Sequence, residues 1–376
     1  MNLKDNISKR AMSVDGSGIR RAAAKVFNII NPINLSIGQP DFLVDNIIKK
    51  SAIDSINNNK NGYTPTAGID DLKNKIISNH KYANTHKENI DILITSGVTA
   101  GIFLSITTCL NPGDEIIIPD PYFLQYVEAC KILEVNPIFM DTYPDFSITA
   151  EKMEKLITQK TKAIIINSPN NPTGVIIPNE ELQKIISLAY EKNIFVIYDE
   201  IYSDFIYTNK SPHTLPFFEN LIILNGFSKS YAMTGWRIGY VVAAPLIIEK
   251  MTRMQGQIYV SAASPAQYGA MEAFNADTQP VIQEYKERHK LVQDILSENF
   301  NLSKSIGSYY YFVEVPKKIN MTSEKFCELV AQYRVIIIPG NVFSQKDTHF
   351  RLSFCVDKTK LTEGLLILNN IVKGYI

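Results

Sequence analysis

The sequence predicts an α/β protein with a smaller α+β region, and three observations support this fold class. Short runs of β-branched residues recur between residues 91 and 243, with helical patterns between them. The apolar residues of these runs are nearly continuous, which is typical of parallel strands covered by helices on both faces. After about Gln279 the pattern changes to a long polar helix followed by new strands. Such strand–helix alternation followed by a different arrangement indicates two kinds of domain.

Six runs are expected to form the strands of the main sheet. In chain order they are DILIT (91–95), EIIIP (115–119), AIIIN (163–167), IFVIYD (194–199), LIILN (221–225) and IGYVVA (238–243). Their order and spacing leave room for a helix between several neighbouring pairs, as a mostly parallel sheet requires.

Helices are expected at three places around these strands. One starts at Glu181, preceded by Asn179 as a capping residue, because apolar side chains follow at helical spacing. A second is expected to start near Thr66, and a third after Ser96. The apolar positions are Leu182, Ile185, Ile186 and Ala189 in the first helix, and Ile69, Leu72, Ile76 and Ile77 in the second.

The C-terminal part is expected to be a separate, smaller α+β domain. It contains a helix from about Gln279, the run YYYFVEV (309–315), a helix over about 323–333 and two further strands in VIIIPG (335–340) and FRLSFC (350–355). We therefore expect a large domain over 46–280. The small domain is expected to combine 281–376 with an N-terminal arm over 1–45.

Composition and charge narrow the functional classes. The chain has 376 residues, with 38 Lys and Arg against 38 Asp and Glu. This balance argues against a protein that binds nucleic acid through phosphate contacts or is dedicated to anionic membranes. No apolar run approaches the ~20 residues of a membrane span, and the N-terminus lacks the apolar core of a secretory signal. We expect a cytoplasmic location, where the four scattered cysteines would stay reduced.

No metal centre is expected. The cysteines form no C-x-x-C pair, and none has a histidine at ligand spacing. The five histidines show neither an H-E-x-x-H motif nor the spacing of a catalytic triad, and we expect them at the surface.

The strongest chemical signal is NGFSKSYAMTGWRIGY (225–240), which places Lys229 just after an apolar strand. Ligand sites in α/β proteins gather at this edge of the sheet. A partly desolvated lysine there has a lowered pKa and can attack a carbonyl, and Arg237 can hold an anion. On this stretch alone, a solvated lysine and a surface arginine remain the alternative.

This stretch resembles the lysine signature of the class I/II pyridoxal-phosphate aminotransferases, which have fold type I. The matching positions are Gly226, Phe227, Ser228, Lys229, Ala232, Met233, Gly235, Arg237, Ile238 and Gly239. The resemblance continues in the family's order from SIGQPDF (36–42) to FRLSFC (350–355). It is closest to the bacterial and archaeal branch that includes aspartate, kynurenine and broad-range aminotransferases. It implies pyridoxal 5′-phosphate as cofactor and a homodimer with sites at the subunit interface.

For catalysis, the resemblance implies that Lys229 forms a Schiff base with the cofactor and then moves the proton between the substrate Cα and the cofactor's C4′. Asp199, in IYDEIYSDF (197–205), would keep the pyridine nitrogen protonated. Tyr202 and Asn171 would donate to the phenolic oxygen of the cofactor.

For binding, the resemblance implies a phosphate cradle of Gly97, Val98 and Thr99, with Arg237 as counter-charge. Tyr63 would reach the phosphate of the neighbouring subunit. Phe123 would stack on the cofactor ring. The substrate carboxylate would be gripped by Arg351, with a backbone contact from Gly38, and Phe123 and Asn171 would also face the substrate.

The expected reaction is amino-group transfer between an L-amino acid and a 2-oxo acid. A carbon–sulfur β-lyase of the same fold is an alternative, because Lys229 and Asp199 would serve both reactions. A non-catalytic, cofactor-sensing regulator is less favoured, since no DNA-binding module precedes the catalytic region. A distal substrate carboxylate has only weak candidate partners, namely Arg253, Arg20 and Arg21. Aspartate is therefore less favoured as a substrate than aromatic or methionine-like amino acids or a broad substrate range.

Overall fold

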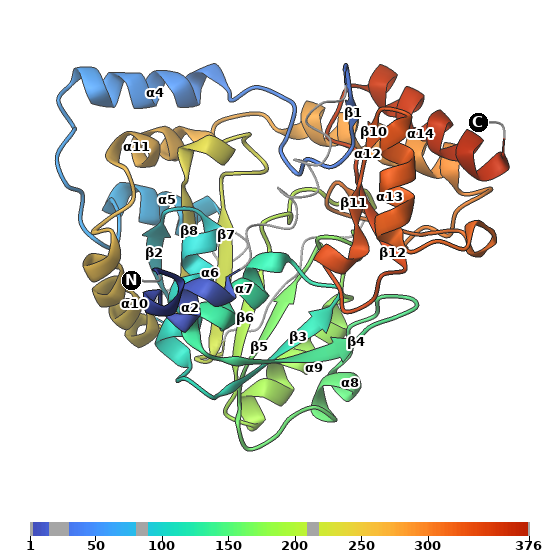
Figure 1. Cartoon of the computed structure of the whole chain (residues 1–376). Helices are drawn as coiled ribbons and strands as arrows, with labels where there is room; N and C mark the ends of the chain where they lie inside the picture. Colours follow the sequence, from blue (N-terminus) through green and yellow to red (C-terminus); the bar gives the residue numbers. More distant parts are fainter. Residues whose placement is uncertain (1–2, 15–29, 80–88, 209–217, 375–376) are drawn as a thin grey trace.

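The computed structural model describes residues 3–14, 30–79, 89–208 and 218–374. Two regions lie side by side, one built on a large sheet and one on small sheets with the C-terminal helices (Figure 1). The α/β fold class with a smaller α+β domain is confirmed.

The large sheet has seven strands in the order β2-β8-β7-β6-β5-β3-β4. The strands are β2 (Asp91–Thr95), β3 (Glu115–Asp120), β4 (Asn136–Asp141), β5 (Thr161–Asn167), β6 (Phe195–Asp199), β7 (Leu221–Gly226) and β8 (Gly239–Ala243). Strands β3 to β7 pair in parallel, and β8 runs antiparallel to both of its neighbours. All six expected strands are present. Strand β4 was missed because Pro137 interrupts a run that is only partly buried.

Helices cover both faces of this sheet, which explains the continuous apolar runs. In β2, Ile92 and Ile94 pack into the core on one face, and Leu93 packs into the core on the other. One face is covered by α6 (Val98–Cys109), α7 (Leu124–Leu133) and α10 (Pro245–Ile258). The other is covered by α5 (Asp70–Asn79), α9 (Asn179–Glu191) and α11 (Ser264–Ala273), with α4 (Asn46–Asn57) outside α11 and α8 (Ala150–Glu154) beside α9.

Two expected helix starts were misplaced. Helix α5 begins at Asp70 and not near Thr66, because the chain first turns at Gly68, which has φ +108°. The amide of Gly68 donates to the carbonyl of Pro65 at 2.8 Å and closes this turn. Asn179 is the first residue of α9, and Pro178 takes the capping position.

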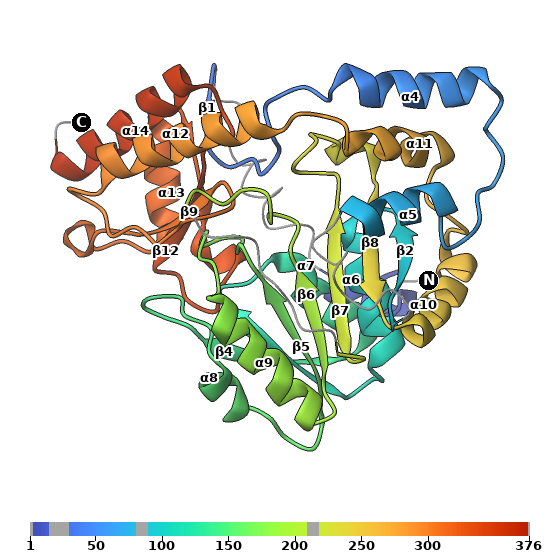
Figure 2. The ribbon, with the colours of Figure 1, turned by 180° about the vertical axis from the view of Figure 1, so that it is seen from behind.

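The small region contains two further sheets. Strand β1 (Ile33–Asn34) pairs in parallel with β10 (Val335–Ile336). Strand β12 (His349–Ser353) lies between β11 (Ile338–Pro339) and β9 (Tyr310–Glu314) in an antiparallel sheet. The helices here are α12 (Gln279–Leu296), α13 (Ser323–Gln332) and α14 (Lys358–Lys373). Figure 2 shows α12 lying beside α14.

We propose that the domain division is 46–280 against 1–45 with 281–376. The supporting observation is a core in which Ile33 and Leu35 of the arm pack mainly with residues from 285 to 372, joined by residues 201–207 of the large domain. The two short N-terminal helices are an exception, since α2 (Lys9–Ser13) contacts α7 and follows α1 (Leu3–Asn6). Within the described ranges, no helix combines the length and the apolar character that a membrane span needs.

Candidate active site

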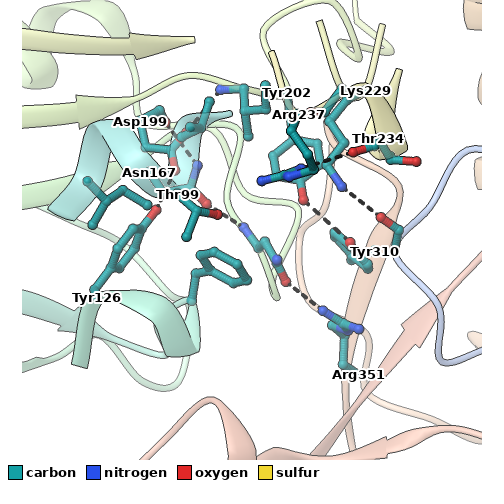
Figure 3. A pocket seen from close by; sticks show the side chains of 17 residues that line it. Thr99, Tyr126, Asn167, Asp199, Tyr202, Lys229, Thr234, Arg237, Tyr310 and Arg351 are labelled. Carbon is teal, nitrogen blue, oxygen red and sulfur yellow. Dashed lines mark hydrogen bonds between the residues drawn. The ribbon is translucent and has the colours of Figure 1, made fainter. Parts of the chain in front are cut away.

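A pocket of about 220 Å³ lies between the carboxyl ends of the large-sheet strands and the small domain. Ten of the predicted site residues line it: Gly38, Val98, Thr99, Phe123, Asn171, Asp199, Tyr202, Lys229, Arg237 and Arg351. Figure 3 shows Asp199 and Tyr126 on the left, Lys229 and Arg237 at the upper right and Arg351 at the lower right. Residues far apart in the sequence therefore converge on one cavity.

Asp199 is the last residue of β6 and is almost fully buried. Its Oδ2 accepts a hydrogen bond from the Tyr126 hydroxyl at 2.8 Å, and its Oδ1 accepts one from the amide of Ile201 at 3.1 Å. Burial raises the pKa of Asp199 to about 6, although the bond from Tyr126 opposes this rise. The side chain is thus a carboxylate at neutral pH, held where a cationic ring nitrogen would be its counter-charge.

Lys229 follows β7, the strand next to β6, and its amine faces the same pocket. The Nζ atom donates to the carbonyl of Gly38 at 2.7 Å. Burial lowers the pKa of Lys229 to about 8, and the positive charges of Arg351 and Arg237 act in the same direction. A neutral, nucleophilic amine is therefore available close to physiological pH.

The turn at 168–174 is held in place by Asn167, the last residue of β5. The Asn167 side chain donates to the carbonyl of Asp199 at 2.9 Å and accepts from the amide of Asn171 at 2.7 Å. Asn171 in turn accepts from Nη1 of Arg351 at 3.0 Å. The turn thus links the Asp199 side of the pocket to the arginine on the small domain.

Glycines bring a cation close to the N-terminus of α6. Gly97 caps this helix with φ +80°, and a Cβ at this position would lie 2.5 Å from Nη2 of Arg237. A Cβ on Gly239 would lie 2.8 Å from the amide nitrogen of Val98. Amide groups at a helix N-terminus beside an arginine are a typical phosphate site.

Arg351 is buried in β12 and has no carboxylate within ion-pair distance among the described residues. Its guanidinium lies 4.4 Å from the ring centroid of Tyr310 and 4.5 Å from that of Phe343. Nη2 donates to the carbonyl of Ser36 at 2.7 Å, and Nε has no partner. A buried cation without an anion is costly, so this side chain is well placed to bind a carboxylate.

These groups fit the cofactor that the resemblance implies. Asp199 suits the pyridine nitrogen, Lys229 the aldehyde, and Arg237 with the glycine-lined N-terminus of α6 the phosphate. Phe123 also lines the pocket and meets the Tyr126 ring edge-on at 5.6 Å between centroids, so a flat apolar surface is present.

Sequence reasoning missed three residues of the site: Tyr126, Asn167 and Tyr310. Tyr126 lies one helical turn after Phe123, and this spacing was the available signal. Asn167 ends a strand that had been recognised. Tyr310 belongs to the run YYYFVEV, where nothing distinguishes it from Tyr309 or from the next tyrosine.

Some predicted residues lie elsewhere. Tyr63 is 90% exposed and lies outside the pocket of its own chain, so its role across an interface stays a prediction. Arg253 is exposed on α10 and pairs with Glu249, while Arg20 and Arg21 lie outside the described residues.

The expectation that all histidines lie at the surface was wrong for two of them. His289 and His349 are buried, each stacked on an aromatic ring, so they serve as core residues. His80, His86 and His213 lie outside the described residues. In the part of the chain that the structure covers, no group of three or more His, Cys, Asp or Glu side chains is arranged to hold a metal ion.

Comparisons with known proteins agree with this site. The sequence profile described as Aminotransferase class I and II matches residues 30–367. The chain is 35% identical to an aspartate aminotransferase of Sulfolobus acidocaldarius and 31% identical to aromatic-amino-acid aminotransferase 2 of Thermococcus litoralis, with 98% of both chains covered in each case.

Solved structures show the same likeness. The fold superposes on the Thermus thermophilus aspartate aminotransferase with maleate at a TM-score of 0.91 and 27% identity, covering 97% of this chain and 99% of the other. Together with the match to the family profile over most of its length, this likeness shows that the chain belongs to the class I and II aminotransferases, as a pyridoxal-phosphate-dependent enzyme of fold type I.

Proposed function

We propose that Lys229 is the residue that bonds covalently to pyridoxal 5′-phosphate and performs the proton transfers of an amino-acid transamination. The observation that supports this most is the position of its amine, which faces the pocket with a pKa lowered by burial to about 8. The buried carboxylate of Asp199, from the neighbouring strand, lines the same cavity.

The other residues would hold the cofactor in one orientation. Asp199 would pair with the ring nitrogen, and Phe123 would lie against the ring. Tyr202 and Asn171 would donate to the phenolic oxygen. The phosphate would be bound by Gly97, Val98 and Thr99 at the start of α6, together with Arg237.

When bound, pyridoxal phosphate supplies an electron sink that stabilises negative charge at the substrate Cα. Arg351 would bind the substrate α-carboxylate through two parallel hydrogen bonds, with a backbone contact from Gly38, and so fix the direction of the Cα–H bond. The free amine of Lys229 would take the proton from Cα of the amino donor. It would later return a proton to Cα of the amino acid formed from the 2-oxo acid.

We further propose that amino donors with aromatic or other apolar side chains are preferred over aspartate. Among the described residues, the charged groups that line the pocket are Asp199, Lys229, Arg237 and Arg351. The three cations are Lys229, the proposed cofactor lysine, and two arginines whose proposed ligands are the phosphate and the α-carboxylate. No fourth arginine or lysine of the described residues lines the pocket to bind a distal carboxylate. The choice rests on this lining, because the relatives include an aspartate aminotransferase at 35% identity as well as an aromatic-amino-acid aminotransferase at 31%.

The proposal includes a homodimer in which Tyr63 reaches the phosphate of the neighbouring subunit. Tyr63 is almost fully exposed in the single chain. Exposed apolar side chains on α4 and around the end of α10 offer an adjoining surface: Ile47, Ile53, Ile56, Met254, Ile258 and Val260. We also propose a cytoplasmic location, which suits four cysteines that are all unpaired.

Two measurements test the proposal. Reduction of the cofactor-bound protein with borohydride, followed by peptide mapping, should tag Lys229, and a tag on another lysine refutes the assignment. Mixing the cofactor-bound protein with single amino acids and following the absorbance of the bound cofactor gives the donor range. Aromatic donors should react at lower concentrations than aspartate. Pyruvate and ammonia release from cystathionine without a 2-oxo acid would instead identify a β-lyase.

A further inference from the structure

Residues 35–41, here called the strap, cross the small-domain side of the pocket without regular secondary structure. Successive carbonyls of the strap accept hydrogen bonds from other parts of the chain. The Leu35 and Ile37 carbonyls accept from the amide and the hydroxyl of Ser353, at 2.8 and 2.7 Å. The Ser36 carbonyl accepts from Arg351 at 2.7 Å. The Leu35 amide also donates to the carbonyl of Ile336 in β10 at 2.9 Å, so backbone pairing ends at Leu35 and side chains place the rest of the strap.

The Gly38 carbonyl is the point where the strap meets the catalytic amine. It accepts from Nζ of Lys229 at 2.7 Å and from the hydroxyl of Tyr309 at 3.0 Å. Position 38 can hold only glycine, because a Cβ there would lie 1.8 Å from the Tyr310 hydroxyl oxygen. The carbonyl oxygen of the strap thus reaches Lys229 only while the backbone stays close against these tyrosines.

The far end of the strap is fastened to helix α12 by a polar cluster in which the Asp41 side chain is 27% exposed. Nη1 of Arg288 donates to both carboxylate oxygens of Asp41 at 2.9 Å. The Tyr285 hydroxyl donates to Oδ1 of Asp41 at 2.7 Å and accepts from the Asp41 amide at 3.3 Å. The side chain of Arg288 is only 8% exposed, and its Nε is held by Glu284 at 3.1 Å.

In this cluster the negative charge of Asp41 faces the positive charge of Arg288. Burial alone would raise the pKa of Asp41, but the hydrogen bonds from Arg288 and Tyr285 outweigh it and hold this pKa below its ordinary value. Asp41 is therefore ionised throughout the neutral range. Charge-assisted hydrogen bonds of this kind are short and directional. They therefore fix the position of the strap backbone near Asp41, which is three residues after Gly38.

We propose that Asp41, Tyr285 and Arg288 are positioning residues that hold the Gly38 carbonyl against Lys229 and so favour the protonated form of the free lysine. This inference rests on the proposed function of Lys229. A carbonyl that accepts from an ammonium group stabilises the charged form. When the cluster is loosened, the carbonyl moves away and the amine loses its proton more readily. The cluster would then set the pH at which the free amine becomes neutral.

The other groups that act on Lys229 lie on different elements. They are Cys355, Arg351, Arg237 and Asp199, with the rings of Tyr202 and Tyr309 at 5.8 and 5.9 Å from Nζ. Because Tyr285 also hydrogen-bonds to Cys355, the Arg288 variants, which keep that bond, separate the effect of the strap from that of the thiol.

The test compares Tyr285→Phe and Arg288→Gln with the unchanged protein, all freed of cofactor. Competitive acetylation at a series of pH values, read for the Lys229 peptide by mass spectrometry, gives the acid dissociation constant of Lys229. We expect each variant to raise this constant by about threefold or more, since a hydrogen bond to a charged group is lost. Arg288→Lys should restore part of the difference.

Tyr311→Phe is the matched control. Tyr311 is also a buried tyrosine of the small-domain core, but its hydroxyl donates to the carbonyl of His289 at 3.4 Å and does not touch the strap. The Tyr311→Phe substitution should leave the acid dissociation constant of Lys229 unchanged. If Arg288→Gln does not fold, Arg288→Lys decides the test, since it keeps the positive charge and the bond between Tyr285 and Cys355 and should still raise the constant, by less.

The outcomes separate the two levels of the argument. Borohydride mapping is run on the unchanged cofactor-bound protein. A tag on Lys229, together with variants that lower thermal stability but leave its dissociation constant unchanged, overturns the positioning role alone. A tag on a different lysine overturns the proposed function and this inference with it. A tag on Lys229 with a raised constant in both Tyr285→Phe and an Arg288 variant, and no change in Tyr311→Phe, supports both.

Discussion

The two sides of the pocket are built in different ways. On the large domain, Asp199 ends β6 and Lys229 follows β7 by three residues, so regular strand pairing places both side chains. On the small domain, Arg351 lies in a strand, but the strap that it contacts pairs with strand backbone only at Leu35, and from Ser36 to Asp41 it is held by side-chain hydrogen bonds. The first side is organised by backbone pairing, and the second by individual side chains.

This difference separates the expected effects of substitution. A change at a strand end on the large domain removes a chemical group and leaves its backbone in place. A change on the small-domain side also removes one of the contacts that position the backbone. The four predictions below test this contrast, from the largest expected effect to the smallest.

Lys229→Ala should abolish the covalent bond to the cofactor and lower kcat/KM by at least about 10³-fold, because no other amine can take the Cα proton. The fold should persist, since the lysine contributes one hydrogen bond to Gly38. Steady-state kinetics and the absorbance of the bound cofactor measure both effects. Lys162→Ala, on an exposed lysine, is the control. Retention of more than about a tenth of the activity would contradict the assignment.

Arg351→Met should raise the substrate dissociation constant by about 10- to 100-fold, because charge-assisted hydrogen bonds to the carboxylate are lost. Thermal stability should fall as well, since the guanidinium's hydrogen bonds to the Ser36 carbonyl and to Asn171 are lost. Half-reaction titrations and thermal unfolding measure the two quantities. Arg334→Gln removes an exposed arginine paired with Glu363 and should change neither. An unchanged dissociation constant in Arg351→Met would refute carboxylate binding.

Tyr126→Phe should shift the acid limb of the activity profile to higher pH. The Tyr126 hydroxyl donates to Asp199 and lowers its pKa, which burial raises to about 6. Without this donor the pKa rises, so Asp199 becomes protonated at a higher pH as the solution is acidified. We expect a loss of about 3- to 10-fold near pH 6 and less at pH 8. Tyr122→Phe removes a hydrogen bond from Gln345 instead, and it should leave the acid limb of the pH–activity profile unchanged.

Tyr63→Phe should weaken cofactor binding by about 2- to 10-fold, the value of one hydrogen bond to a phosphate across the interface. The subunit itself should be unaffected, because Tyr63 makes little contact within its own chain. Equilibrium dialysis gives the cofactor affinity, and light scattering gives the mass. Tyr190→Phe, on α9, is a control on another exposed tyrosine. A monomeric mass for the unchanged protein would exclude the shared site.

The same contrast explains how far the sequence could be interpreted. Strand ends of a parallel sheet are visible as apolar runs followed by polar residues, so Lys229 could be placed at a site edge, and the family resemblance then added Asp199 and Asn171 to the same site. Tyr126 was missed because its hydrogen bond to Asp199 crosses 73 residues of sequence. Tyr285 and Arg288 were assigned only to a polar helix, since nothing in QEYKERHK shows that the side chains point at Asp41. Long-range packing decides such contacts, and a local pattern does not record it.

The bond between Ser36 and Arg351 joins residues that are 315 positions apart in the chain. During synthesis, the strands of the large sheet, all between residues 91 and 243, leave the ribosome well before Arg351 does. Strand β1 likewise can pair only after its partner β10, at residues 335–336, has been synthesised. The nascent chain can therefore assemble the end proposed to bind the phosphate first, whereas the end proposed to bind the amino acid is completed only when translation is almost finished.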